Sequence, residues 1–381
     1  MLTTWHIITG EYPPQEGGVA DYARLVALGL AAQGDRVHVW APAIAEADAA
    51  EPGVEVHRLS GLFGARALGA LGRELAAAGP GEILLQYVPQ AFGMKGMNLP
   101  LCLWLFARRR AGITIMFHEV AVALRRGQPM RHNIIGAVHL AMAFVLTRAA
   151  RRCLVSTAAW EPRLRALAPA DAAISWLPVP SNVPAIDDPG AALAVRKMLS
   201  CEGGIVLGHF GTARETWIAD QLGAVIPQLL RERPEAAFVL IGRDSRALRD
   251  RLLEGTPEVL HARVRATGRL APTDVSHHLR ACDLMLQPYP DGVSTRRTSL
   301  MAALVHRRPI ITTAGAVTEP LWKQSGAVAL VPAGDLGAMR AALMRLIDDG
   351  AERARLGAAA GALYAARFDI ARTIAALREA C

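Results

Sequence analysis

The chain has 381 residues, of which 52% are hydrophobic, 20% charged and 5% aromatic. This composition excludes a mainly disordered or collagen-like protein, and the length predicts two domains or one large one. The formal net charge is +8, and residues 1–90 carry −5 while residues 91–165 carry +10. The basic character is therefore one regional block. No basic strand with interleaved aromatic residues accompanies it, which does not favour a nucleic-acid binder.

Short apolar runs alternate with helical patterns along the first half of the chain. A helix is predicted over residues 21–32, because its apolar residues recur at helical spacing and Gly34 follows it. Strands that alternate with helices indicate a parallel, doubly wound α/β sheet. The strands are predicted at residues 5–9, 37–40, 54–59, 83–87, 113–117 and 153–156.

A proline-rich stretch interrupts this alternation. Residues 177–184 hold three prolines in eight positions and are the best candidate for an interdomain linker. A second series of strands is predicted at 205–210, 237–241, 264–267, 283–287, 309–313 and 327–331, followed by a helical tail from about residue 337. We therefore expect an N-terminal domain over residues 1–180, a C-terminal domain over 181–360, and a terminal helix within 361–381 that packs back toward the N-terminal domain.

The cysteine pattern and the length of the apolar runs indicate whether the chain is cytoplasmic, secreted or membrane-spanning. The five cysteines show no C-x-x-C spacing and their number is odd, which favours a reduced cytoplasmic environment. The first residues show no signal-peptide pattern. The longest uncharged apolar runs, 96–107 and 132–147, are shorter than the roughly 20 residues that span a bilayer.

Arginines flank these two apolar runs. Apolar surface edged by arginine suits docking on an anionic leaflet, so we expect a cytoplasmic protein that can be peripheral at the inner face of a membrane. Two core helices with solvated ends are the alternative. The flanking residues are Arg108, Arg109, Arg110, Arg125, Arg126, Arg131, Arg148, Arg151 and Arg152.

Glycine and polar residues follow predicted strands in the first half. Paired glycines between a strand and a helix let the backbone approach a ligand, and helix amides can hold an anion. Polar residues at the carboxyl ends of parallel strands lie where doubly wound folds bind ligands. An ordinary loop and a structural histidine are the alternatives. The candidates are Gly17, Gly18, Gln86, Tyr87, His118 and Glu119.

Three successive strands of the second half end near glycine, two of them in Gly-Arg. A shared position at one sheet edge suits a crevice for an anionic, planar ligand, although Gly-Arg pairs also occur in plain turns. The candidates are Gly211, Thr212, Arg214, Arg243, Gly268, Arg269 and Leu270.

The most informative stretch is residues 288–304, where a loop rich in proline and glycine runs into an apolar helix. Asp291 and Ser299 have seven residues between them, and Arg296 and Arg297 carry forked guanidinium groups suited to phosphate. Free amides, the helix dipole and the arginines would together favour a diphosphate, the alternative being a basic surface turn. The amides expected to be free belong to Gly292, Val293 and Ser294.

With these motifs the chain resembles the family-4 retaining glycosyltransferases of the GT-B architecture over essentially its whole length. Residues 12–20 are similar to the family's P-P-x-x-G-G loop, 177–183 to its P-N-x-x segment, and 291–302 to its E-G-F-G-x-P-x-x-E-A-M-A signature. The resemblance implies two Rossmann-like domains facing across a cleft. The C-terminal domain would bind a nucleoside-diphosphate sugar and the N-terminal domain the acceptor.

Residue roles follow from the resemblance. His118 would contact the transferred sugar and Asp291 its hydroxyls, while the amides after Asp291 would hold sugar and phosphate. The glycine pair at 17–18 would approach the diphosphate, and residues 268–270 would lie near the base. Gln86, Tyr87 and Glu119 would line the acceptor side of the cleft. With Arg296 and Arg297, His118 and Asp291 form the predicted catalytic set.

Three positions depart from the family pattern. Ser299 stands where a second glutamate grips the ribose. Thr212 and Trp217 stand where the family has an arginine and a lysine. Arg214, Arg296 or Arg297 is expected to supply the missing positive charge.

The predicted function is that of a retaining hexosyltransferase acting on a lipid-linked or polysaccharide precursor. No D-x-D triplet and no metal-ligand spacing of His, Cys and Asp occurs, so metal-independent chemistry without a bound cofactor is expected. Fixed cations and amides would then stabilise the leaving diphosphate. The alternatives are a nucleotide-sugar epimerase on the same fold and a non-catalytic nucleotide-sugar-binding homologue.

Overall fold

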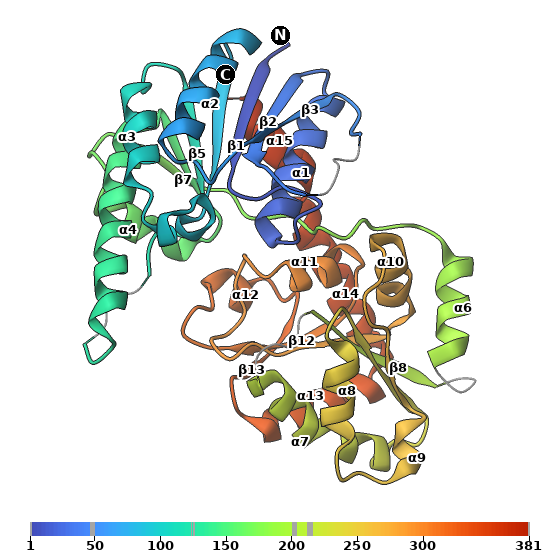
Figure 1. The fold of residues 1–381 in the computed structure, drawn as a ribbon. Helices are drawn as coiled ribbons and strands as arrows, with labels where there is room; N and C mark the ends of the chain where they lie inside the picture. Colours follow the sequence, from blue (N-terminus) through green and yellow to red (C-terminus); the bar gives the residue numbers. More distant parts are fainter. Residues whose placement is uncertain are drawn as a thin grey trace. The chain divides into compact units, whose positions relative to one another are not determined.

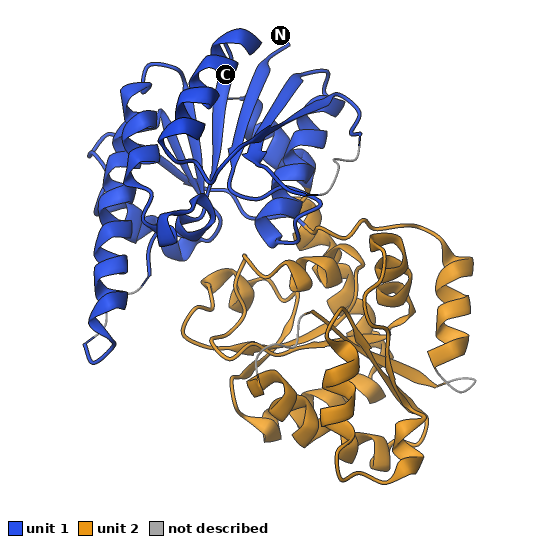
Figure 2. Ribbon diagram, in the orientation of Figure 1, with its two compact units in different colours: residues 1–180, 370–381 blue, residues 181–369 orange. Residues whose placement is uncertain are grey.

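The computed structural model describes residues 2–45, 50–122, 124, 126–199, 204–211 and 216–379. The chain divides into two compact units (Figure 2). Unit 1 comprises Met1–Pro180 together with Ile370–Cys381, and unit 2 comprises Ser181–Asp369. Each unit holds one parallel sheet with helices packed against it (Figure 1), which confirms the predicted α/β fold with two Rossmann-like domains.

Unit 1 contains a seven-stranded sheet in the order β3-β2-β1-β4-β5-β6-β7, with each neighbouring pair parallel. Its strands are β1 (Thr4–Thr9), β2 (Arg36–Pro42), β3 (Val54–Leu59), β4 (Glu82–Tyr87), β5 (Ile113–Phe117), β6 (Arg152–Val155) and β7 (Ala173–Trp176). Its helices are α1 (Gly18–Ala32), α2 (Ala65–Ala78), α3 (Leu99–Ala107), α4 (Met130–Ala149), α5 (Glu161–Arg165) and α15 (Ile370–Arg378), with short 3₁₀ turns at Pro89–Phe92, Met94–Gly96 and Ala158–Trp160.

Unit 2 contains a six-stranded parallel sheet in the order β10-β9-β8-β11-β12-β13. Its strands are β8 (Ile205–Phe210), β9 (Ala236–Ile241), β10 (Val264–Ala266), β11 (Leu284–Gln287), β12 (Ile310–Ala314) and β13 (Ala329–Pro332). Its helices are α6 (Pro189–Leu199), α7 (Thr216–Glu232), α8 (Ser245–Leu253), α9 (Glu258–His261), α10 (Pro272–Ala281), α11 (Thr298–Val305), α12 (Pro320–Gln324), α13 (Leu336–Asp348) and α14 (Gly350–Arg367).

The predicted strands are all present, each end lying within two residues of its expected position. They were recognisable because both faces of a parallel sheet are covered, so the strands read as continuous apolar runs. In β1, Ile7 packs into the core on one face and Ile8 into the core on the other. The strand that was not predicted, β7, is a short edge strand in which only Ile174 is buried.

The last helix of the chain returns to unit 1. Helix α15 packs on α1, where a Cβ atom on Gly29 would lie 2.7 Å from Cδ1 of Ile374. Arg378 Nε lies 3.1 Å from Oδ2 of the buried Asp35. The expected boundary at residue 360 falls within α14, and the chain passes between units at Asp369.

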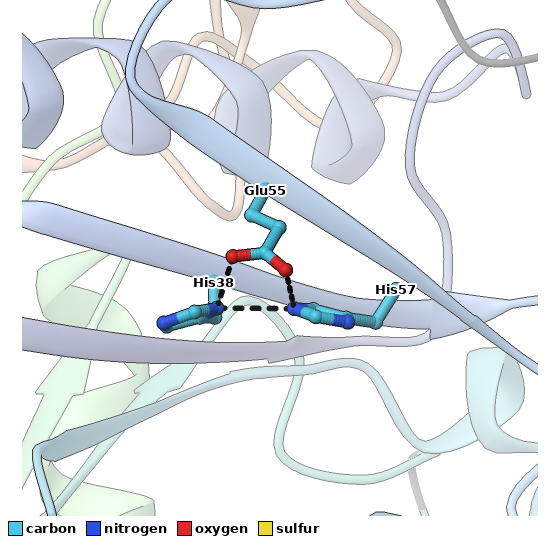
Figure 3. Close-up of side chains that lie close together, drawn as sticks. All are labelled: His38, Glu55 and His57. Carbon is cyan, nitrogen blue, oxygen red and sulfur yellow. Dashed lines mark hydrogen bonds and ion pairs between the residues drawn. The ribbon is translucent and has the colours of Figure 1, made fainter. Parts of the chain in front are cut away.

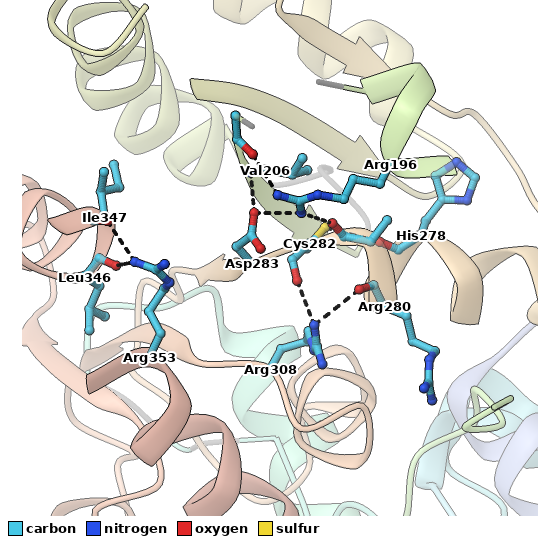
Figure 4. Close-up of polar contacts among 12 residues, drawn as sticks. Arg196, Val206, His278, Arg280, Cys282, Asp283, Arg308, Leu346, Ile347 and Arg353 are labelled. Carbon is cyan, nitrogen blue, oxygen red and sulfur yellow. Dashed lines mark hydrogen bonds and ion pairs between the residues drawn. The ribbon is translucent and has the colours of Figure 1, made fainter. Parts of the chain in front are cut away.

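Arginines brace the amino end of β11 inside unit 2 (Figure 4). Asp283 Oδ2 accepts hydrogen bonds from Arg196 Nη1 at 2.8 Å and from the Val206 amide at 2.7 Å. Arg308 Nη1 donates to the carbonyls of Arg280 and Cys282 at 3.2 and 2.9 Å. These contacts fix the start of β11 and so the position of the loop that leaves its other end.

In the part of the chain that the structure describes, no helix is both long and apolar enough to cross a membrane. The apolar run 132–147 lies in α4, which packs against α3 and contributes Met142 and Leu146 to the core of unit 1. The described cysteines, Cys102, Cys153 and Cys282, are free and buried.

Candidate functional site

In unit 2 the strand order changes direction between β8 and β11, the position where open α/β sheets bind ligands at the carboxyl ends of their strands. Three glycines meet at this edge. The Gly211 amide donates to the Ile241 carbonyl at 3.1 Å, and Gly242 forms a bridge with Gly268. A Cβ atom on Gly242 would lie 2.6 Å from the Gly211 carbonyl oxygen, so only glycine fits. The structure thus brings the predicted strand-end glycines together.

The loop after β11 places a compact polar cluster beside this edge. Tyr289 Oη lies 2.9 Å from Ser299 Oγ, and the Arg297 guanidinium lies 4.7 Å from the centre of the Tyr289 ring. Arg297 also forms an ion pair with Asp291. A Cβ atom on Gly211 would lie 3.7 Å from Ser299 Oγ, so the cluster adjoins the glycine edge.

The Arg297 guanidinium still has a hydrogen-bond donor that is not used by the described residues in this arrangement. Its side chain is 22% exposed, and among the described residues its Nε atom is buried without a hydrogen-bond partner. It is also the N-cap residue of α11, where the helix dipole favours an anion. The cation is therefore held by Asp291 and Tyr289 at the position where an anionic ligand would be stabilised.

The prediction of free amides at Gly292 and Val293 is wrong. The Gly292 amide donates to the Tyr289 carbonyl at 3.2 Å and the Val293 amide to the Thr313 carbonyl at 2.8 Å. Helix α11 begins only at Thr298, so the first amides of the helix belong to residues 298 and 299. The Ser294 hydroxyl is buried, and its oxygen has no partner among the described residues.

The sequence analysis did not predict Glu319, whose carboxylate accepts hydrogen bonds from Thr295 in this loop. Glu319 is only 6% exposed, and its carboxylate accepts from the Thr295 amide, from Thr295 Oγ1 at 2.7 Å and from Trp322 Nε1 at 2.7 Å. The signal that could have found it is an acidic residue directly before the proline that opens α12. Its three donors anchor the segment between Asp291 and Arg297.

The other predicted residues of unit 2 lie along the same edge. Arg243 follows Gly242 at the end of β9, and both Arg243 and Arg269 are exposed. Leu270 and Arg296 are half-buried. Two further candidates, Thr212 and Arg214, lie outside the described residues.

In unit 1 the strand order changes direction between β1 and β4, and two predicted residues meet beside it. His118 Nε2 lies 2.9 Å from Gln86 Oε1, so this nitrogen carries the proton of the neutral ring. The His118 ring also packs edge-on against Tyr22 at 4.9 Å. Burial lowers the pKa of His118 to about 3, so the imidazole is neutral at physiological pH.

Two further acceptor-side candidates differ from each other. Tyr87 is fully buried and packs against Phe92 and Phe117, so its ring belongs to the core. This corrects the expectation that Tyr87 lines a cleft, because neighbouring strand residues point to opposite faces and Gln86 takes the other one. Glu119 is half-buried directly after His118.

The glycine pair lies at the start of α1, which begins at Gly18 rather than at residue 21. A Cβ atom on Gly17 would lie 2.4 Å from Glu11 Oε1, and that oxygen accepts from the Ala20 amide at 3.1 Å. In this structure, therefore, the anion at the start of α1 is the Glu11 carboxylate. Space for a Cβ atom at Gly18 is open.

The basic block of the sequence separates into two places. At the amino ends of the unit 1 strands, a cavity of about 1600 Å³ is lined partly by arginines from the ends of α3 and α4, where cations offset the helix dipoles. Exposed Arg126 and Arg131 lie instead at the start of α4. The arginines lining the cavity are Arg108, Arg109, Arg110, Arg148, Arg151 and Arg378.

A third cluster lies on the sheet of unit 1, among residues without metal-ligand spacing along the chain. His38 on β2 and Glu55 and His57 on β3 bring three potential ligand atoms within 4.8 Å of one another (Figure 3). Sequence spacing does not reveal this group, because strand pairing brings His38 next to residues that are 17 and 19 positions away along the chain.

Comparison with family models gives one match, which lies in the second half of the chain. Residues 204–349 match the family described as glycosyl transferases group 1. This range contains the glycine edge, the Asp291–Arg297 pair and Glu319. No curated protein matched the chain.

Solved structures share the whole fold at low sequence identity. Sucrose-phosphate synthase from Thermosynechococcus elongatus is 17% identical with a TM-score of 0.73, covering 99% of this chain and 98% of that one. Anabaena HepE in complex with UDP and glucose is 16% identical with a TM-score of 0.69, covering 99% and 98%. WaaG, a glycosyltransferase involved in lipopolysaccharide biosynthesis, is 16% identical with a TM-score of 0.67, covering 96% of each chain. Together with the family match, they support a GT-B glycosyltransferase.

Proposed function

We propose that the chain is a retaining, metal-independent glycosyltransferase of family 4. It would transfer a hexosyl group from a nucleoside-diphosphate sugar to an acceptor hydroxyl. The observation that carries this proposal is the match of residues 204–349 to group 1 glycosyltransferases, because that range contains the polar cluster at the glycine edge. The complex of the Anabaena neighbour with UDP and glucose favours a donor of this class.

The residues of unit 2 suit the leaving group. As the donor bond breaks, negative charge builds on the diphosphate, and a preorganised cation lowers the barrier most when it is already in place. Arg297 meets this requirement because Asp291 and the Tyr289 ring hold its guanidinium at the start of α11. Arg296 lies beside it. Ser299 would give the ribose one hydroxyl in place of a carboxylate.

His118 is proposed to contact the transferred sugar as a neutral hydrogen-bonding group. Because burial lowers its pKa to about 3, the ring is not an imidazolium acid at neutral pH, and it is only a weak base. The diphosphate oxygen is then left to accept the acceptor's proton, as expected for retaining chemistry without a separate base. Asp291 would interact with the sugar hydroxyls once Arg297 engages the diphosphate.

A donor screen tests the proposal. The purified chain is melted with a panel of nucleoside-diphosphate sugars, and the stabilising donors are then assayed for transfer in excess chelator. We expect one donor class to raise the melting temperature, since saturating ligand stabilises by a few kcal/mol, and transfer to persist without metal. Sugar-nucleotide conversion without acceptor would instead identify an epimerase. Binding without conversion would identify a non-catalytic homologue.

We also propose that the start of α4 docks on an anionic membrane leaflet, which suits a lipid-linked acceptor. Leu124, Met130 and Ile134 are 50%, 78% and 53% exposed. Arg126 and Arg131 are exposed beside them. Apolar side chains edged by arginine bind an anionic surface through burial and charge together.

Vesicle co-sedimentation tests this surface. Wild type should bind phosphatidylglycerol vesicles at low salt, and Met130→Glu with Ile134→Glu should abolish binding. Val259→Glu is the control, because Val259 is 72% exposed in unit 2. No binding of the wild type at low salt would reject the docking proposal without affecting the donor proposal.

A further inference from the structure

His38, Glu55 and His57 share one face of the unit 1 sheet. Strands β2 and β3 pair in parallel with His38 opposite Glu55 and Trp40 opposite His57, and side chains two positions apart point the same way. Figure 3 shows the carboxylate of Glu55 turned toward the nitrogens of both rings. The donor atoms thus converge from two strands on one point.

The separations among the donor atoms suit a metal ion. His38 Nδ1 lies 3.0 Å from His57 Nε2 and 3.2 Å from Glu55 Oε2, and His57 Nε2 lies 3.6 Å from Glu55 Oε1. Around a tetrahedral Zn²⁺ with bonds of about 2.0–2.1 Å, neighbouring ligand atoms are roughly 3.3–3.4 Å apart. We propose that these three residues bind a divalent transition metal, with Zn²⁺ as the best fit and water as the fourth ligand.

Proton accounting also favours a cation at this point. If His38 Nδ1 carries a proton, this N–H donates a hydrogen bond to the lone pair of His57 Nε2. Glu55 Oε1 still faces that same nitrogen at 3.6 Å, so two acceptors oppose each other. One metal ion satisfies all three lone pairs at once.

Packing holds the two rings in place. The His38 side chain is 1% exposed and its ring stacks on His6 at 5.3 Å, while the His57 ring stacks on Trp40 at 4.0 Å. Glu55 is 58% exposed, which leaves the site open to an entering ion and to water. Imidazole and carboxylate ligands in a preset arrangement suit Zn²⁺ better than the oxygen-seeking Mg²⁺ or Ca²⁺.

Two features limit the affinity. A metal on His38 Nδ1 requires the proton on Nε2, and that atom has no hydrogen-bond partner among the described residues. Loss of such a supporting partner typically lowers metal affinity by about 10–100-fold. Arg36 also lies 3.9 Å from Glu55 and competes for the carboxylate. The site is therefore expected to be weaker than a closed structural zinc site.

The test uses the full chain stripped with chelator and titrated with Zn²⁺ alone by calorimetry. We expect one equivalent to bind, and Co²⁺ to give the intense visible absorption of a tetrahedral site with nitrogen ligands. Glu55→Gln and His57→Gln should each weaken Zn²⁺ binding by about tenfold or more. Zn²⁺ should raise the melting temperature of the wild type by more than that of Glu55→Gln at the same Zn²⁺ concentration.

His132→Gln is the matched control, since His132 is a half-buried histidine elsewhere in unit 1. If His57→Gln fails to fold, Glu55→Gln still decides, because its side chain is largely exposed. The proposal is overturned if the wild type shows no saturable binding, or if both variants bind as tightly as the wild type. Transfer in chelator is measured separately, so this result does not depend on the proposed reaction.

Discussion

Arg297 connects the sequence motif of unit 2 to its proposed chemistry. Its guanidinium is shared between Asp291 and the face of Tyr289, which orients the group before any ligand arrives. An arginine held in this way loses little freedom on binding a diphosphate. The neighbouring Glu319 has a different role, because it is buried and stabilises the loop rather than a ligand.

Arg297→Ala is expected to lower kcat/KM for transfer by about 10²–10³, because it removes a preorganised charge from the leaving group. Arg297→Lys should restore part of the activity, since it keeps the charge and loses the fork. Steady-state kinetics with the identified donor provide the measurement. Arg251→Ala, which removes an exposed ion pair with Asp220, serves as the control. Unchanged kinetics in Arg296→Ala and Arg297→Ala would rule out this assignment.

Glu319→Ala is expected to destabilise unit 2 by at least about 3 kcal/mol. The substitution leaves the amide and hydroxyl of Thr295 and Nε1 of Trp322 without an acceptor, and each unsatisfied buried donor costs about 1–3 kcal/mol. Urea unfolding measures the change. Glu319→Gln should lose less, because one carbonyl oxygen remains to accept. Equal stability of all three proteins would show that the loop does not depend on this carboxylate.

At the scale of elements, the candidate site depends on glycine residues that follow three neighbouring strands, because their backbones can come close together. Gly211, Gly242 and Gly268 have φ of +149°, +128° and +69°, in the region that favours glycine. The Gly211 and Gly242 backbones approach each other closely, and Ser299 beyond the loop after β11 adjoins Gly211. Helix α11 then begins with Arg297 at its N-cap.

Gly242→Ala is expected to destabilise the chain by about 1–3 kcal/mol and to abolish the thermal shift by the donor. The new Cβ would lie 2.6 Å from the Gly211 carbonyl oxygen, and φ is unfavourable for alanine. Gly223→Ala is the matched control, because this helical glycine has open space around it and alanine should stabilise it by about 0.5–1 kcal/mol. Wild-type stability and donor response in Gly242→Ala would contradict the close packing.

For the molecule as a whole, buried histidines set the response to acid. Burial lowers the pKa of His118 to about 3 and the pKa values of His209 and His306 to about 4. Between pH 6.5 and 4 the unfolded chain binds protons at these sites and the native chain does not. Stability is therefore complete above pH 6.5 and falls as the pH decreases through this window.

Unfolding midpoints in urea between pH 7 and pH 5 test this dependence. Each of the three histidines should cost about 2 kcal/mol of stability at pH 5, since one pKa unit corresponds to about 1.4 kcal/mol. Both units are affected, because His118 lies in unit 1 and the other two in unit 2. His118→Gln should reduce the change in the unfolding midpoint of unit 1 between pH 7 and pH 5. A midpoint that stays constant over this range would contradict these pKa directions.

The strand pattern and the glycine edge were predictable because their causes are local or topological. A buried parallel strand is a continuous apolar run, and the carboxyl ends of parallel strands meet at one edge whatever the loops do. The prediction of free amides failed because it relied on closeness to the helix along the sequence. Before the helix begins, the Gly292 amide already donates to the Tyr289 carbonyl and the Val293 amide to the Thr313 carbonyl. Glu319 was missed because its partner, Thr295, lies 24 residues away.

By itself the sequence determined the α/β class, the two-part division near residue 180 and the strand ends that meet at one edge of each sheet. These features depend on periodicity, prolines and the order of strands. The tertiary structure alone decided which side chains meet: His38 with Glu55 and His57 across paired strands, and Arg297 with Tyr289 and Asp291 around a loop. Such groupings arise from strand register and loop conformation, which hydrophobic patterning does not encode.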